Sequence, residues 1–336
     1  MDPANALVLL TNFVLLPAVS YGSQLALGAL GITLVYGILR FSHFAHGDVM
    51  AFGTMAVILF TWALQAAGVS IAPLPTALLA LPAGILVTAI LLLGFDRGVY
   101  RFYRRVRAAP IVVVMASLGV MFVVNGIVRF IIGPNDVNFA DGARFLFTVR
   151  DFRDYTGLAE GVGLRWSQLI TIVVTLIVMA ALFWFLNRTR TGKSMRAFSD
   201  NEDLALLSGI NPERVVTVTW LLVAALVTVA GTLYGLDKSF KAFTYFQLLL
   251  PMFAAAILGG MGNPLGAVAG AYIIAFSEVG VTYAYRRFFE YLLPEGYAPS
   301  TLMQLLSTDY KFAVSFVLLV LVLLFRPTGL FKGQSQ

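Results

Sequence analysis

Long runs of apolar residues, separated by shorter polar stretches, follow one another along the whole chain. A helix needs about 20 mostly apolar residues to cross the hydrocarbon core of a bilayer. Runs of roughly that length occur at 20–38, 48–66, 75–94, 111–132, 167–186, 216–236, 247–261, 264–285 and 310–326. The pattern predicts an all-α fold, a polytopic transmembrane helical bundle of about eight or nine spans.

Two places leave the number of spans open. The stretch 5–19 is also apolar, but Pro17 interrupts it. The runs 247–261 and 264–285 are separated only by a Gly/Pro break, so they could form one helix, two helices or a re-entrant pair. With no linker in the sequence, residues 1–336 are expected to form a single integral membrane domain. The first residues lack the basic region of a signal peptide, so we interpret them as retained.

Composition supports a membrane protein and excludes several kinds of site. Hydrophobic residues make up 59% of the chain and charged residues only 12%, against about 25% charged in soluble domains. Cysteine is absent, which excludes disulfides and thiolate metal sites. The net charge of +6 is explained by the positive-inside bias of membrane loops, and we expect no nucleic-acid partner.

The loop charges also predict an orientation. Lys and Arg number 13 in the loops 39–47, 94–110, 187–214 and 326–336, and 8 in the opposite loops 133–166, 237–247 and 286–309. This bias predicts a cytoplasmic C-terminus and an N-terminus outside. The loop 133–166 is the largest outward segment, and it could be a docking surface or an ordinary solvated loop.

A short helix is predicted within the cytoplasmic loop 187–214. Ser199 and Glu202 fit an S-x-x-E capping box, Gly209 suits a left-handed C-terminal cap, and Pro212 prevents continuation. These signals predict about two turns of helix outside the membrane. Its apolar side would consist of Leu204, Ala205, Leu207 and Ile210. Such a side could be covered by a partner, by the bundle itself or by lipid headgroups.

The Gly-rich break begins at Gly259 and Gly260 and continues to Gly270. Three of its glycines, Gly262, Gly266 and Gly270, are spaced by four, so they would lie on one helical face and allow two helices to approach closely. Asn263 is a candidate N-cap, and Pro264 suits a first helical turn. The break is interpreted as a close-packing joint in preference to a part of the substrate path.

Polar residues near the spans are the remaining candidates for function. His43, His46 and Asp48 lie in the turn after the first span, but without a further strong ligand we favour a structured turn over a metal site. Within spans, polar side chains are costly and often functional. Asn125 is expected to face the bundle interior, whereas other polar residues, Gln168, Arg129 and Glu278, are weaker candidates.

The chain shows no catalytic motif. Thr191-Gly192-Lys193-Ser194 looks like the end of a nucleotide-binding P-loop, but the required first glycine is replaced by Asn187 and a membrane helix precedes it in place of a strand. We therefore expect neither enzymatic activity nor a bound cofactor.

Four stretches match one family in order along the chain: GITLVYGILRFSHFAHGDV (31–49), RTRTGKSMRAFSDNEDLALLSGINPERV (188–215), AAAILGGMGNPLGAVAGAYIIAFSE (254–278) and YKFAVSFVLLVLVLLFRPTGL (310–330). With these residues the chain resembles the H-type permease subunits of high-affinity branched-chain amino-acid ABC importers.

The resemblance implies a subunit in the bacterial inner membrane that imports solute together with partners. These would be a second related permease, a periplasmic solute-binding protein and two ATPase subunits that use ATP. The segment 199–212 would be the coupling helix, with contacts from Glu202, Leu204, Ala205, Leu207, Gly209, Ile210 and Asn211. The Gly-rich break would belong to the pore-forming core, and Phe44, His46 and Gly47 would form a signature turn.

Several departures from the family pattern leave the solute open. Ser42-His43 precedes Phe44 where the family commonly has I/V-N, the basic segment 100–107 is unusual, and the outer segments carry Lys238, Lys241, Arg286 and Arg287. Urea, short amides or other amino acids are alternatives within the family. The alternative of another class is a stand-alone channel or ion-coupled carrier, for which Glu278 would be the candidate intramembrane carboxylate.

Overall fold

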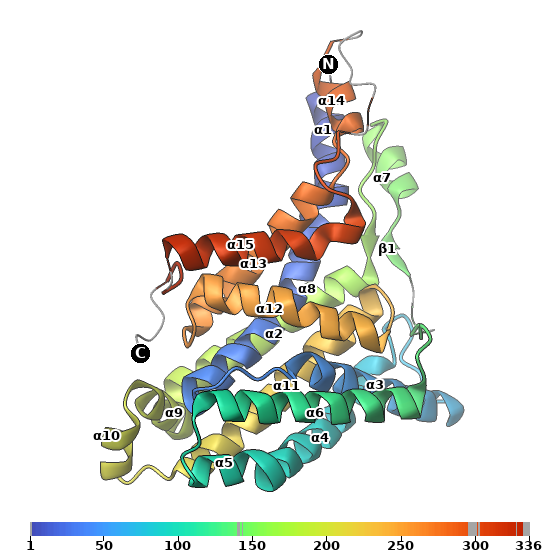
Figure 1. The fold of residues 1–336 in the computed structure, drawn as a ribbon. Coiled ribbons are helices and arrows are strands. Elements are labelled where there is room, and N and C mark those ends of the chain that lie inside the picture. Colours follow the sequence, from blue (N-terminus) through green and yellow to red (C-terminus); the bar gives the residue numbers. More distant parts are fainter. Residues whose placement is uncertain are drawn as a thin grey trace.

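The computed structural model describes residues 2–139, 142, 144–294, 301, 303–326 and 328–331. These residues form helices and one small antiparallel hairpin of β1 (Phe145–Phe147) and β2 (Leu164–Arg165) (Figure 1). The α-helices are α1 (Pro3–Leu10), α2 (Leu16–Leu39), α3 (His46–Ala66), α4 (Ala77–Phe95), α5 (Arg101–Arg105), α6 (Pro110–Ile132), α7 (Val149–Thr156), α8 (Trp166–Arg188), α9 (Arg190–Asp200), α10 (Glu202–Leu207), α11 (Pro212–Asp237), α12 (Ala242–Gly259), α13 (Pro264–Thr282), α14 (Arg286–Leu292) and α15 (Lys311–Phe325).

Nine helices in the described part of the chain are long and apolar enough to cross a membrane. This confirms the predicted polytopic bundle. The two runs around the Gly-rich break are separate helices, α12 and α13, which lie against each other as an antiparallel hairpin.

The first span is longer than the sequence suggested. Pro3–Leu39 is one continuous helical segment of 37 residues, with a π-helical turn at Thr11–Leu15 between α1 and α2. The amide of Leu16 bonds to the carbonyl of Thr11, five residues back, and Pro17 follows in the first turn of α2. The wider turn accommodates the proline without ending the helix. At 1.5 Å per residue the segment is about 55 Å long, well beyond the roughly 30 Å of a hydrocarbon core.

The spans differ greatly in how deeply they are buried. Helix α2 is buried along almost its whole length, and α11, α12 and α13 pack on it. In the most apolar 18 residues of α11, 72% are buried within the chain, against 6% in the span that ends with α15. The core of the bundle is therefore built around α2 and α11, and α15 lies at its edge, where most of its apolar surface is free for lipid or another subunit.

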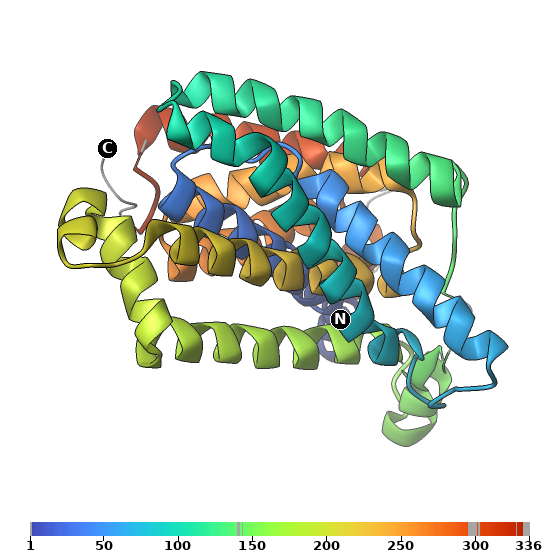
Figure 2. The same cartoon turned by 90° about the horizontal axis from the view of Figure 1, so that it is seen from below.

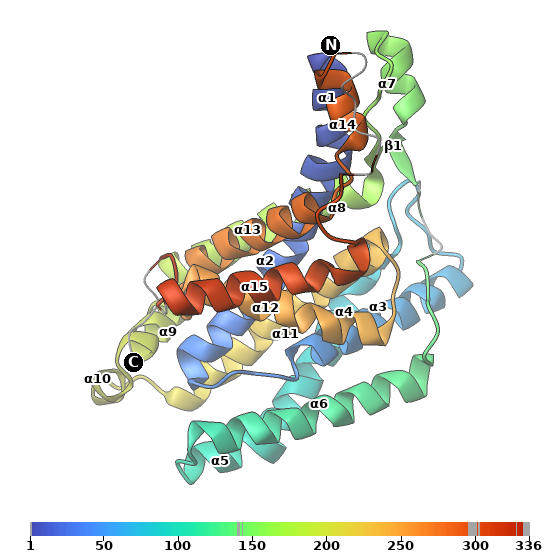
Figure 3. The same cartoon turned by 45° about the horizontal axis from the view of Figure 1, so that its top comes forward.

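Segments at or beyond the ends of the spans gather at two opposite ends (Figures 1 and 3). Following the orientation predicted from the loop charges, we call α1, α7, α14 and the loop 157–163 the outer protrusion; the N-terminus lies there. We call α9, α10 and the α12–α13 turn (260–263) the inner corner. Figure 2 shows α9 set at a steep angle to α8, so that α10 projects past the ends of the spans.

Candidate functional site

The sharp bend between α8 and α9 places the predicted coupling segment at the inner corner. Thr189 ends α8 and caps α9, because its hydroxyl accepts the amide of Gly192 at 3.0 Å. A side chain at position 192 would meet the carbonyl oxygen of Phe185 at 2.2 Å, so only glycine fits this bend. Met195 and Phe198 are buried, which fixes α9 to the bundle by its apolar face.

The Ser199–Glu202 capping box predicted for the short helix is wrong, because Glu202 is the first residue of α10. Asn201, not Ser199, is the N-cap of α10, and its side chain accepts the amide of Leu204 at 3.0 Å. Ser199 is the second-last residue of α9, and its hydroxyl donates to the carbonyl of Gly37 on α2 at 2.9 Å. The guanidinium of Arg40, just after α2, donates to the carbonyl of Ser199. The predicted cap is instead a link between α9 and α2.

The other end of α10 agrees with the prediction. Gly209 has a φ of +78°, in the left-handed region, and closes the helix. Asn211 caps α11 by accepting the amide of Arg214 at 3.3 Å, and Pro212 opens that helix. Helix α10 is therefore a separate short helix between α9 and α11, capped by Asn201 at its start and closed by Gly209 at its end.

The leucines of α10 point away from the rest of the chain. Leu204 is 61% and Leu207 85% exposed, and Leu206, which the sequence pattern did not single out, is 43% exposed. Ala205 is 3% exposed and Ile210 half-buried, so these two face the bundle. The predicted apolar side is therefore divided. Ala205 packs against the bundle and anchors the helix, whereas the leucines are exposed.

A cleft of about 510 Å³ lies beside α10, toward the connection between α5 and α6. Glu202 and Asp203 from the first turn of α10 line one part of it. Arginines line the facing part: Arg40, Arg104, Arg105 and Arg107. Arg104 is held by a two-point ion pair with the buried carboxylate of Asp96. The displayed leucines are thus bordered by a groove with charges of both signs.

Three glycines of the α12–α13 hairpin lie directly against backbone atoms, but they are not the same three that the sequence predicted. A Cβ at Gly259 would lie 2.1 Å from the carbonyl oxygen of Gly266, and one at Gly270 would lie 2.1 Å from that of Ala255. Gly262 is in the turn, with a φ of +85°, and does not share their helical face. The close-packing stripe therefore consists of Gly259, Gly266 and Gly270.

The turn of this hairpin is fixed from two sides. Asn263 caps α13 by accepting the amide of Gly266 at 3.1 Å, with Pro264 in the first helical position, as predicted. Gly260 has a φ of +101° and a carbonyl that accepts the amide of Asn263. The amide of Leu330 bonds to the carbonyl of Leu258 at 2.8 Å, so residues after α15 also pack on this turn.

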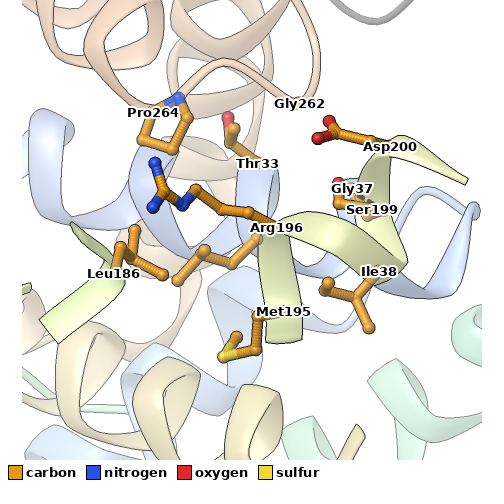
Figure 4. A pocket seen from close by; sticks show the side chains of 11 residues that line it. Thr33, Gly37, Ile38, Leu186, Met195, Arg196, Ser199, Asp200, Gly262 and Pro264 are labelled. Carbon is orange, nitrogen blue, oxygen red and sulfur yellow. Dashed lines mark hydrogen bonds between the residues drawn. The ribbon is translucent and has the colours of Figure 1, made fainter. Parts of the chain in front are cut away.

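A cavity of about 170 Å³ lies where α2, α9 and the hairpin turn meet. Its lining includes Thr33 and Gly37 of α2, Arg196 and Asp200 of α9, and Gly262 of the turn (Figure 4). The predicted coupling segment and the predicted Gly-rich joint are therefore brought together at one small space.

The signature turn lies deep between the spans. The imidazole Nε2 of His46 is 2.9 Å from the carbonyl oxygen of Gly28 on α2. A Cβ at Gly47 would lie 2.6 Å from the carbonyl oxygen of Tyr245. The ring of Phe44 packs against that of Phe253, 5.4 Å between centroids. These three predicted residues hold the turn to α2 and α12.

His43 completes an aromatic cluster with Tyr100 and Trp220. Burial lowers the pKa of His43 well below its usual value, and the neighbouring His46 lowers it further. A neutral imidazole suits this packing. In the described part of the chain no group of three or more His, Cys, Asp or Glu could hold a metal ion.

Asn125 faces the interior, as expected. Its amide donates to the carboxylate of Asp48 at 2.6 Å, which joins α6 to the first turn of α3. Asp48 is 1% exposed. The pair is a polar contact between two spans, where buried polar groups are costly unless satisfied.

Comparisons with known proteins agree with this architecture. The model of the family described as "Branched-chain amino acid transport system / permease component" matches residues 14–323. The chain belongs to this family. The permease is 30% identical to the high-affinity branched-chain amino acid transport system permease protein LivH of Salmonella typhimurium, over 93% of this chain and 92% of that one. It is 28% identical to BraD of Pseudomonas aeruginosa over 94% of both chains.

One solved structure aligns with most of the permease. PsaBC from Streptococcus pneumoniae in complex with Fab covers 93% of this chain and 91% of that one, with a TM-score of 0.47 and 11% identity. That likeness is too distant to support a conclusion. The assignment of the permease as a subunit of an ABC transporter system rests on the family match and on the relatives.

Sequence reasoning missed two residues and one pairing. Leu206 is displayed beside Leu207, Asp96 ties Arg104 to Trp220, and Asp48, named in the sequence only as part of the turn, accepts a hydrogen bond from Asn125. The sequence offered one signal for these contacts: Asp48 and Asp96 lie inside or next to apolar runs, and buried carboxylates need partners.

Proposed function

We propose that this permease is the membrane-spanning subunit of an ATP-driven importer for branched-chain amino acids or related small polar solutes. It would work with a second related permease, a periplasmic solute-binding protein and two ATPase subunits in the bacterial inner membrane. The inner corner would then be cytoplasmic, as would the C-terminus, and the outer protrusion would face the periplasm.

One observation supports this function above the others: α10 displays leucines outside the spans on a helix that is itself anchored. Leu207 is 85% exposed although it is the last residue of a capped helix whose Ala205 is buried. A partner that covers these leucines would bury apolar area worth about 25 cal/mol per Å². Partner-docking segments are typically such small apolar clusters with charged rims.

The links from α10 inward indicate how the helix would act as a coupling helix. It continues into α9, α9 bonds through Ser199 to Gly37 of α2, and α2 packs on α11, α12 and α13. A push on α10 would therefore move the central helix of the bundle. A stand-alone channel would have no use for an anchored helix that displays leucines, so this arrangement favours the ATP-driven importer.

The test replaces Leu207 with arginine in the assembled importer. Because Leu207 is 85% exposed, the Leu207→Arg permease should insert and assemble with its partner permease normally. Uptake of leucine should fall at least about tenfold, as expected for the loss of a central interface residue. Binding of the ATPase subunits, measured by co-purification, should weaken in parallel.

Ala205→Arg is the matched contrast. Ala205 is 3% exposed, so arginine there should destabilise the inner corner itself and lower the yield of folded protein. Normal uptake by the Leu207→Arg importer would contradict the coupling role. Leucine uptake by the permease in liposomes without any ATPase would contradict the proposed function as a whole.

A further inference from the structure

The cavity of about 170 Å³ at the inner corner combines chemical groups that the coupling role does not require. It is enclosed by four elements: α2, the end of α8, α9 and the hairpin turn with the start of α13. A single water needs only about 15 Å³ of such space. The cavity is therefore large enough for a small solute.

Two groups of opposite charge line the cavity. Figure 4 shows the guanidinium of Arg196 and the carboxylate of Asp200 directed toward the space beside Pro264 and Gly262, with Thr33 between them in the view. Arg196 donates one N–H to Asn187 at 3.0 Å, which leaves other N–H groups of its five for a ligand. An ammonium–carboxylate zwitterion would meet both charges at once.

Thr33 is a deeply buried polar residue in the lining of the cavity. It is 1% exposed, and its Oγ1 is buried without a hydrogen-bond partner among the residues the structure describes. A buried hydroxyl that lacks a partner is unfavourable, so the site favours an occupant that supplies one. A ligand carboxylate or ammonium group close to Arg196 and Asp200 would do so.

The rest of the lining is mostly apolar, with Ser199 as a further polar residue. Aliphatic and thioether side chains form the apolar walls: Leu34, Ile38, Leu186 and Met195. Met195 is 1% exposed and Leu186 5% exposed, so this part of the wall belongs to the packed core. A branched aliphatic side chain would find matching surface here, whereas a polar one would lose its hydration.

We propose that this cavity binds one zwitterionic α-amino acid with a branched aliphatic side chain, and that binding from the inner side slows the importer. Arg196 would bind the α-carboxylate, Asp200 the α-ammonium group, and Thr33 would complete the hydrogen bonds. The choice of amino acid rests on the proposed function, but the match between zwitterion and cavity does not.

The position of the cavity explains the effect on transport. Its walls belong to α9, which carries α10, and to α2 and the hairpin turn, to which α9 is bonded. A ligand held by all three elements stabilises the arrangement seen here over any other, in proportion to its difference in affinity for the two. Amino acid that accumulates on the inner side would thus oppose the motion of α10.

Binding is tested on the assembled importer in nanodiscs, with ATPase subunits but without binding protein, by titration with radiolabelled L-leucine. Binding should saturate, and serine, which has the same zwitterion without the aliphatic side chain, should compete poorly. Arg196→Gln and Asp200→Asn should each weaken binding about tenfold or more, because each removes a charged hydrogen-bond partner. Thr33→Val, which keeps the shape, should weaken it severalfold.

Lys193→Gln is the control, since Lys193 is an exposed cation of α9 that does not line the cavity. It should bind leucine like the unmodified importer. No saturable binding, or binding that none of the three cavity variants weakens, would overturn the proposal. The melting temperatures of all variants are measured, so that weak binding by an unfolded variant is not counted as support for the proposal.

Transport supplies an independent measurement. In proteoliposomes, leucine added on the ATPase side should slow uptake that depends on the binding protein, and Asp200→Asn should make uptake resistant to it. If uptake is normal but unaffected by leucine on the ATPase side, the inhibitory role is wrong and the proposed function stands. If no branched-chain amino acid is taken up at all, the proposed function is wrong, whereas leucine binding in nanodiscs still decides the cavity.

Discussion

The inner corner and the outer protrusion are both built from short helices outside the spans, yet they are held in different ways. At the inner corner, Met195, Phe198 and Ala205 are buried, and Ser199 bonds to the backbone of α2. In the outer protrusion, α7 and α14 have no buried residue in the part of the chain described, whereas α1 buries Asn5, Ala6 and Leu9.

Apart from Ala6 and Leu9 of α1, which are each 1% exposed, polar bonds hold the outer protrusion together. Glu160 accepts a hydrogen bond from the hydroxyl of Tyr291 at 3.0 Å and lies 3.5 Å from the guanidinium of Arg287. The side chains of Asn5 and Asn12 accept the amides of Glu160 and Gly163. Each such bond contributes about 1 kcal/mol, and the groups are partly solvated, so the protrusion is expected to open locally before the bundle does.

The difference shows which end is suited to transmit a force. A helix fixed by burial and bonded to the central helix moves with it, whereas a helix held by exposed polar contacts adapts to whatever binds it. The two ends are nevertheless joined, because Pro3–Leu39 is one helical segment that begins in the outer protrusion and ends beside Ser199. Three substitutions test this contrast.

The largest effect is expected from Gly270→Ala in the hairpin that supports the inner corner. The new methyl group would lie 2.1 Å from the carbonyl oxygen of Ala255 and 3.0 Å from the amide nitrogen of Gly259, so two backbones must separate. We expect a loss of about 3 kcal/mol or more, seen as a lower melting temperature and yield of detergent-extracted permease.

Gly126→Ala in α6 is the control, because no described atom beyond its own helix and chain neighbours lies within 4 Å of the added methyl group. Alanine in a helix is favoured over glycine by about 0.5–1 kcal/mol, so this variant should be as stable as the unmodified permease or slightly more so. Equal melting temperatures for Gly270→Ala and Gly126→Ala would show that the hairpin tolerates separation and does not anchor the corner.

A smaller effect is expected from Ser199→Ala, which removes the bond from α9 to Gly37 and leaves α10 unchanged. The cost in stability should be about 1 kcal/mol. In the proposed importer, ATP hydrolysis should continue while leucine uptake falls severalfold. Ser194→Ala is the control, since the hydroxyl of Ser194 donates within α9, to the carbonyl of Arg190. If importers with either variant take up leucine equally well, the hydrogen bond from Ser199 to Gly37 does not transmit motion from α9 to α2.

The spans of this molecule could be predicted from its sequence, because a lipid bilayer requires helices of a certain length with apolar surfaces, and both show as long apolar runs. The short helix α10 could also be predicted, from Gly209 and Pro212. The choice of its N-cap could not. Ser199 and Asn201 are both good capping residues, and a bond to Gly37, 162 residues away in sequence, engages the serine elsewhere.

In the candidate site, too, some features could be predicted from the sequence and others could not. Spacing by four identified glycines that allow close packing, but it could not show that Gly262 lies in the turn and that Gly259 takes its place in the contact. The partner of Asn125 was equally hidden, since Asp48 is 77 residues away. Contacts between distant segments decide these points, and one sequence contains no record of them.

The smallest effect is expected at the other end, from Glu160→Gln. Glutamine keeps the shape but removes the charge that attracts Arg287, and Tyr291 then bonds to a neutral acceptor. Amide exchange in α14 and in the first turn of α1 should become severalfold faster, because a bond to a charged group contributes more than one to a neutral group. Exchange in α9 and α10 should not change.

Glu290→Gln provides the comparison within the outer protrusion. Glu290 pairs with Arg286 four residues earlier in the same helix, at 2.9 Å, and such pairs contribute only about 0.3–0.5 kcal/mol. Its effect on exchange should therefore be smaller and confined to α14. If Glu160→Gln also speeds exchange in α10, the continuous helix from Pro3 to Leu39 couples the two ends even without partners, and the outer protrusion is part of the transmission.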